Sequence, residues 1–170
     1  MDRSRKRNVM LWVVLIIALM AVAWRKWKKS RGTAEKFSPM FPTVLFAFVC
    51  LQGAFGAELV TKEGYYKLAV LYSNEEYGLG FNNVLKKEFA GDDREVVASA
   101  PFDRGTVDLR RQLTKIKAAK PEAIYIISNS PDSAVAALKQ IKELRIQAAL
   151  FGSEGLKSDD IVKGAGKAAE

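Results

Sequence analysis

From Lys67 onward, short apolar runs alternate with stretches in which apolar residues recur at helical spacing. Four runs are expected to be strands: residues 68–72, 95–98, 123–127 and 148–151. The first run is apolar at consecutive positions, which is typical of a central strand buried on both faces. Residues 101–106 are expected to form a loop before the second helix. The alternation predicts an α/β fold, a Rossmann-like parallel sheet with helices on both faces.

Signals at the helix ends support this pattern. Ser73 or Asn74 can cap the first helix, and Gly91 follows its last apolar residue. The third helix is predicted to begin after Ser130, because a serine cap is followed directly by Pro131 in the first helical position. Each predicted strand is therefore joined to the next by a helix of ordinary length.

Two apolar runs precede this pattern, so hydrophobic helices are expected in residues 1–57, before a domain at residues 58–170. The first run, from Val9 to Trp24, has basic flanks and is short for a helix that crosses a hydrocarbon core, which needs about 20 residues. Tryptophans lie near its ends, where interfacial aromatic residues collect in membrane proteins. This run alone does not establish a spanning helix.

The second run, from Phe41 to Ala57, ends in small residues, as signal peptides do. Ala54 and Gly56 satisfy the rule of small residues before a cleavage site. The alternative is a membrane hairpin whose basic loop, residues 25–36, stays in the cytoplasm. Both interpretations place the domain in the periplasm or otherwise outside the cytoplasm, tethered to the membrane if no cleavage occurs.

Charge is distributed unevenly along the chain. The formal net charge is +8, yet residues 1–40 hold ten Lys/Arg against two Asp/Glu, and the rest holds 17 of each sign. A neutral domain argues against a nucleic-acid partner. The chain has one cysteine, Cys50, and no histidine, which excludes an internal disulfide, a Cys/His zinc cluster and a histidine base. No enzyme activity, cofactor or metal site is predicted.

Ligands of open parallel sheets bind beyond the carboxyl ends of the strands. The loops expected there carry Tyr77 after the first strand, Asp103 after the second, Asn129 and Ser130 after the third, and Glu154 after the fourth. A receiver domain would need a phospho-acceptor aspartate at a strand end, and a flavodoxin would need a phosphate loop after the first strand. Neither is present, so the pattern predicts binding rather than catalysis.

The same loops carry a family resemblance. Residues 67–78, 108–125, 151–155 and 165–170 resemble, in this order, the Leu/Ile/Val-binding branch of type I periplasmic solute-binding proteins. The resemblance covers most of one lobe, residues 66–170. It implies a two-lobed protein that closes on a branched-chain or related amino acid and delivers it to an ABC permease. The alternative is the extracellular sensing domain of a membrane receptor with this fold.

The resemblance also implies ligand-binding residues. Tyr77 matches a tyrosine that walls the ligand pocket, and Glu154 matches an acid that pairs with the ligand's ammonium group. Asn129 lies where amino acid binders often place a second tyrosine. Without the resemblance, Tyr77 is as well explained by packing and Glu154 by a solvated loop. The family's first lobe and later strands have no counterpart here, so the sequence is expected to be a fragment.

Overall fold

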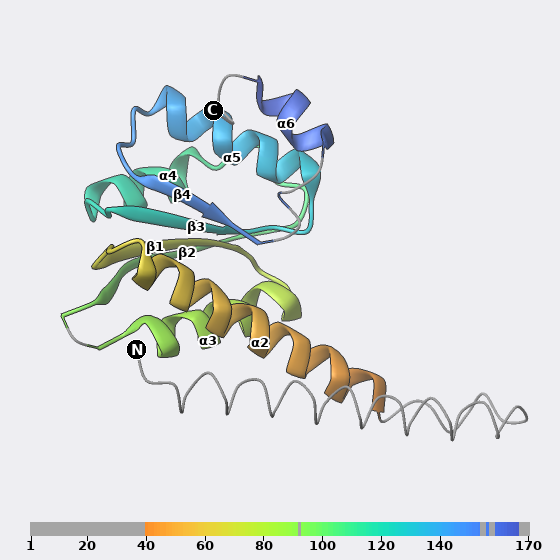
Figure 1. Cartoon of the computed structure of the whole chain (residues 1–170). Coiled ribbons are helices and arrows are strands. Elements are labelled where there is room, and N and C mark those ends of the chain that lie inside the picture. The colour runs from red at the N-terminus through yellow and green to blue at the C-terminus, as the bar shows by residue number, and fades with distance from the viewer. Residues whose placement is uncertain (1–39, 92, 154–155, 157–158, 167–170) are drawn as a thin grey trace, which may run out of the picture. The chain divides into compact units, whose positions relative to one another are not determined.

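The computed structural model describes residues 40–91, 93–153, 156 and 159–166. The chain divides into two compact units, residues 1–42 and 43–170, and nearly all described residues belong to the second. Its helices and strands are shown in Figure 1. They are α2 (Met40–Lys62), β1 (Lys67–Ser73), α3 (Glu76–Phe89), β2 (Glu95–Phe102), α4 (Arg110–Ala118), β3 (Ala123–Ile127), α5 (Pro131–Glu143), β4 (Ala149–Gly152) and α6 (Asp159–Ala165).

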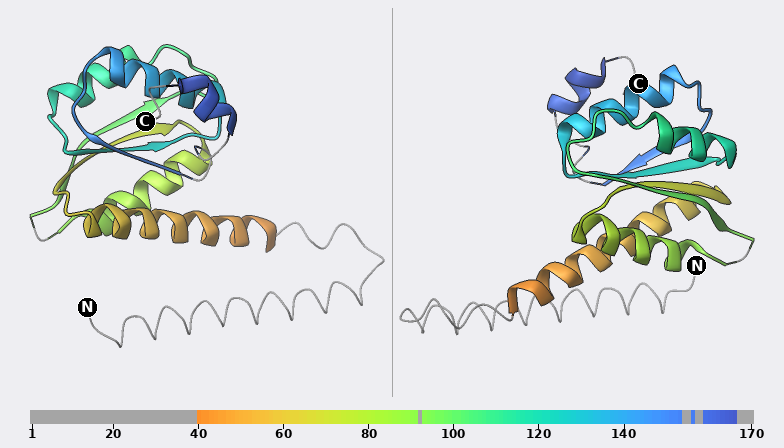
Figure 2. Two further views of the ribbon diagram at one scale, coloured as in Figure 1. Left: turned by 45° about the horizontal axis from the view of Figure 1, so that its top comes forward. Right: turned by 180° about the vertical axis from the view of Figure 1, so that it is seen from behind.

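The four strands form one parallel sheet in the order β2-β1-β3-β4. The chain moves from β1 to β2 in one direction and from β3 to β4 in the other. The order therefore reverses between β1 and β3, and this is the switch point at which open α/β sheets bind ligands. The prediction of a parallel sheet with helices on both faces is confirmed, as both views in Figure 2 show.

Side chains that alternate along β1 and β3 enter two different cores. Leu68 and Val70 join α2 and α3 on one face, while Ala69 and Leu71 join α4, α5 and α6 on the other. All five residues of β3 are buried, and so are the second to fifth residues of β1. Burial on both faces explains why the first strand is uninterrupted in its apolar character.

The second strand is longer than the sequence predicted. β2 continues through Pro101 and Phe102, which pair with Tyr72 and Ser73 of β1, although a loop was expected from residue 101. Proline has no N–H group to donate to a neighbouring strand. Because β2 is an edge strand, Pro101 can occupy a position at which no neighbouring strand requires a hydrogen-bond donor. Phe102 is buried in the core, and this burial stabilises the additional residues of β2.

The helix starts also differ in detail from the prediction. Ser73 is the last residue of β1, and Glu75 occupies the cap position of α3. Ser130 does occupy the cap position of α5, with Pro131 next, but its side chain makes no capping hydrogen bond. Backbone geometry therefore sets both helix starts.

The second apolar run belongs to α2, a continuous helix that passes the boundary expected after Ala57. Val49, Ala57 and Val60 are buried in the core that α2 shares with α3 and the sheet. The small residues at the end of this run, which are expected to mark a signal-peptide cleavage site, have a packing role in α2. A side-chain carbon on Gly53 would lie 2.9 Å from Val84, and one on Gly56 would lie 2.9 Å from the Tyr125 hydroxyl.

Glycines three residues apart share one helix face, so they let α2 approach its neighbours closely. Cleavage at residues 54–57 would remove Val49 and Gly53 from this contact. Within the described part of the chain, no helix combines the length and apolar character needed to cross a membrane.

Candidate functional site

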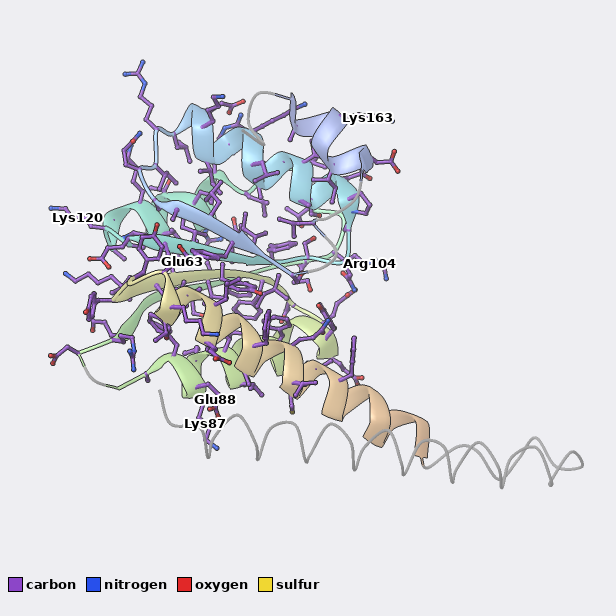
Figure 3. All side chains as sticks on the ribbon, viewed as in Figure 1. Glu63, Lys87, Glu88, Arg104, Lys120 and Lys163 are labelled. Carbon is purple, nitrogen blue, oxygen red and sulfur yellow. The ribbon has the colours of Figure 1, made fainter. Side chains whose placement is uncertain are left out.

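The carboxyl ends of all four strands meet at one edge of the sheet, called here the carboxyl edge. It comprises Ser73 to Tyr77, Asp103, Arg104, Ser128 to Ser130 and Ser153. Figure 3 shows Arg104 at this edge and Lys120 at the opposite edge, where β3 begins. Because the strands are parallel, loops distant in sequence are brought together here.

Glu75 is the central charged group of the carboxyl edge. The Asn129 Nδ2 donates a hydrogen bond of 2.9 Å to Glu75 Oε2, across the switch point. Arg104 Nη1 lies 3.8 Å from Glu75 Oε1, and the Glu75 side chain keeps 32% of its surface exposed. Loops after β1, β2 and β3 thus converge on one carboxylate that still faces solvent.

A second contact holds the loops after β1 and β2 together. The Asn74 backbone N–H donates to Phe102 O at 2.7 Å, which continues the sheet pairing past the end of β1. The Asn74 Nδ2 also donates to Asp103 Oδ1 at 3.4 Å. These bonds fix the backbone directly before Glu75.

Because Gly78 has no side chain, the first turn of α3 can pack closely against the end of β1. A side-chain carbon on Gly78 would lie 2.6 Å from Ser73 Oγ and would overlap the Ser73 carbonyl. This contact fixes the neighbouring Tyr77, which is half-buried with its ring edge-on to Phe81 at 6.0 Å between centroids. The position of Tyr77 at the carboxyl edge is therefore set by its contact with Phe81 and by the close packing of Gly78 on the end of β1.

Two buried hydroxyls at the carboxyl edge have no hydrogen-bond partner among the described residues. They belong to Ser73 and Ser153, at the ends of β1 and β4, which are 1% and 3% exposed. Ser128, after β3, is paired: its hydroxyl donates to Ser130 O at 3.0 Å and accepts from Ser130 N at 3.2 Å. An unpaired buried hydroxyl costs stability, so each of these two groups requires a structural or functional explanation.

The structure places two of the three predicted ligand-binding residues, Tyr77 and Asn129, at the carboxyl edge. Glu154 lies outside the described residues. The sequence pattern predicts no ligand role for Glu75, because its partner Asn129 is 54 positions away in the sequence. Its place two residues after the central strand, beside the switch point, was the available signal.

A lobe with a partly exposed carboxylate and an amide at the switch point of a parallel sheet is suited to bind a small polar solute. Residues 20–170 match the family model for periplasmic binding proteins, and the chain belongs to that family. The resemblance to type I periplasmic binding proteins is thereby confirmed.

The names of the relatives mention two kinds of small molecule. A leucine-, isoleucine-, valine-, threonine- and alanine-binding protein of Pseudomonas aeruginosa is 27% identical over 103 residues, which are 61% of this chain and 27% of that protein. A putative branched-chain amino acid ABC transporter structure from Rhodospirillum rubrum is 21% identical with a TM-score of 0.67, covering 72% of this chain and 35% of that one.

An ABC transporter solute-binding protein from R. palustris was solved in complex with benzoate. It is 21% identical with a TM-score of 0.65, and the match covers 72% of this chain and 33% of that one. The chain thus spans about a third or less of the length of these relatives.

Proposed function

We propose that this chain forms part of the extracytoplasmic solute-binding component of an ABC importer and contributes to binding a branched-chain or related amino acid. Its partners are then the amino acid and a membrane permease, and the protein performs no chemistry. The proposal is supported by the family and by the names of the P. aeruginosa and R. rubrum relatives. The observation that carries it is the Glu75 carboxylate, held at the switch point by Asn129.

The charge of this edge favours an amino acid over an aromatic acid. An amino acid carries an ammonium group, which forms charge-assisted hydrogen bonds with a carboxylate such as Glu75 or Glu154. Benzoate carries only a negative charge, and a carboxylate facing it would raise the free energy of binding. The exposed guanidinium of Arg104 beside Glu75 adds a positive group for the carboxylate of the solute.

The chain by itself should bind such a solute weakly. Hydrogen bonds that involve charge contribute about 1.5–3 kcal/mol each, and a lobe working alone lacks those of the facing lobe. Two or three losses weaken a micromolar affinity to about millimolar. Calorimetry on the full chain with leucine, isoleucine and valine is expected to show no dissociation constant below roughly millimolar. Micromolar binding would contradict a site shared between two lobes.

A chimeric protein that joins this chain to the first lobe of the P. aeruginosa relative tests the proposed roles of Glu75 and Glu154. There, Glu75→Gln and Glu154→Gln should each weaken leucine binding about tenfold or more and should not weaken benzoate binding. Glu63→Gln is the matched control, because Glu63 lies near the opposite edge, before β1 (Figure 3). Unchanged leucine affinity in both variants would show that the ammonium site lies elsewhere.

Export is part of the same proposal. The position of Ala54 to Ala57 within packed α2 favours processing, if any occurs, before this helix rather than within it. N-terminal sequencing of the product from a bacterial periplasmic fraction tests this. A mature chain that begins at residues 55–58 would mean that α2 is not retained, and a cytoplasmic product beginning at Met1 would contradict export.

A further inference from the structure

One face of α2 exposes four large apolar side chains. They are Phe48, Leu51, Phe55 and Leu59, which are 55%, 53%, 64% and 38% exposed. Their spacing of three, four and four residues places them in one row along the helix, called here the α2 stripe. A continuous exposed row of this kind marks a surface that binds something, unlike scattered single residues.

The opposite side of α2 is already occupied by the domain. Val49 and Val60 are buried, and Gly53 and Gly56 hold the helix close to α3 and β3. α2 therefore cannot be surrounded by lipid without leaving the core. The partner of the stripe must approach from outside and contact one side of the helix.

The charge of the sequence before α2 indicates which partner this is. Residues 25–36 contain six Lys/Arg and one Glu, directly before the helix that begins at Met40. An apolar helix face next to a basic segment is typical of helices that lie in the interface of an anionic bilayer. A second copy of the chain fits less well, because each copy carries the same basic segment directly before the stripe in sequence, and these like charges repel each other.

We propose that α2 docks the domain on the surface of an anionic membrane. The α2 stripe enters the boundary between headgroups and acyl chains, and the positive charge of the sequence before α2 favours anionic lipids. The helix lies in the plane of the membrane and stays packed on the sheet. The domain is thereby held at the membrane by a surface contact that is separate from the carboxyl edge.

Vesicle sedimentation with the full chain tests this contact. Binding is expected to vesicles that contain phosphatidylglycerol, weaker to pure phosphatidylcholine, and to fall as salt screens the charges. Each stripe side chain still exposes about half its surface, so truncation should weaken binding about four- to tenfold per residue. The combined variant Phe48→Ser, Leu51→Ser and Phe55→Ser should lose about a hundredfold.

The matched control removes exposed apolar residues elsewhere. Leu79, Val107 and Leu150 are 40%, 60% and 40% exposed and lie outside α2. The combined variant Leu79→Ser, Val107→Ser and Leu150→Ser should bind anionic vesicles as the parent chain does. Equal loss in both variants, with folding confirmed by circular dichroism, would overturn the proposal.

Because the apolar run at residues 9–24 can also bind lipid, a probe must report on α2 itself. In a Cys50→Ser background, a polarity-sensitive dye is attached through Phe55→Cys or, as control, Val107→Cys. Addition of anionic vesicles should shift the emission of the dye at position 55 to the blue and leave the dye at position 107 unchanged. No shift at position 55 in vesicle-bound protein, or a stripe-dependent dimer without lipid, would overturn the proposal.

Discussion

The two ends of the parallel strands form two opposite edges of the sheet, and these edges differ in how completely their polar groups are hydrogen-bonded. At the edge opposite the carboxyl edge, where β1 and β3 begin and which is called here the amino edge, Glu122 Oε2 accepts hydrogen bonds from the backbone N–H groups of Tyr66 at 2.7 Å and Lys67 at 3.1 Å. The Glu122 backbone N–H also donates to Lys67 O at 2.9 Å. These bonds join the start of β1 to the start of β3.

Polar groups at the carboxyl edge are hydrogen-bonded less completely. Ser73 and Ser153 bury hydroxyls without a partner in the described structure, and Glu75 faces solvent between Asn129 and Arg104. The amino edge thus contributes stability, while the carboxyl edge leaves the Glu75 carboxylate accessible to a ligand. Substitutions at the two edges test this difference.

Gly78→Ala should have the largest effect, because the new methyl group would overlap the Ser73 carbonyl. Overpacking of this kind costs about 1–3 kcal/mol, here by forcing α3 away from the end of β1. Urea unfolding followed by circular dichroism measures the loss. Gly80→Ala in the same helix is the control, since its added methyl would meet only Val49 at 3.3 Å. Equal stability of the two variants would contradict the close contact.

Glu122→Gln should destabilise the amino edge by about 1 kcal/mol at neutral pH, a value reduced because the side chain is exposed. Hydrogen bonds from Tyr66 and then Lys67 lower the pKa of Glu122. The stabilisation is therefore full above the unfolded carboxyl pKa of about 4.3 and is lost as the pH falls through the lowered folded pKa.

The pH dependence separates this bond from other effects of the substitution. The stability difference between the parent chain and Glu122→Gln should shrink below about pH 4. Glu95→Gln, at the start of the neighbouring strand β2, provides a control, because the Glu95 carboxylate accepts no backbone hydrogen bond within the described part of the chain. A difference that stays constant down to the acid transition would show that the carboxylate is not responsible.

Ser73→Ala should leave stability unchanged or raise it by up to about 1 kcal/mol, because it removes a buried hydroxyl that has no partner. Ser128→Ala, which removes a paired hydroxyl, should instead cost about 1 kcal/mol. Thermal unfolding of both variants decides between them. A loss for Ser73→Ala as large as that for Ser128→Ala would mean that the Ser73 hydroxyl is satisfied in the free protein.

Glu75→Gln should change the free energy of unfolding least, by less than about 0.5 kcal/mol, since exposed ion pairs contribute little. Its amide can still accept from Asn129, so the loop after β1 should keep its place. Chemical denaturation measures this value. A loss above about 1 kcal/mol would assign Glu75 a structural role and weaken its assignment to ligand binding.

Much of the fold could be predicted because strands and helices leave a local pattern. The range of β3 was predicted to the residue, and β1 and β4 to within one residue at each end. The end of β2 was not, because the burial of Phe102 against distant helices has no local signature. Within the site, Tyr77 and Asn129 were placed at the correct edge, since parallel strands bring their carboxyl ends together.

The alternation of strands and helices, the neutral charge of the domain and its family can be read from the amino-acid sequence alone. These properties follow from residues close together in the chain, whose spacing decides which face each side chain joins. Tertiary structure decided that Gly53 and Gly56 are packing contacts and that Glu75 meets Asn129 across the switch point. Both depend on surfaces distant in sequence, and a contact between such surfaces exists only after the chain has folded.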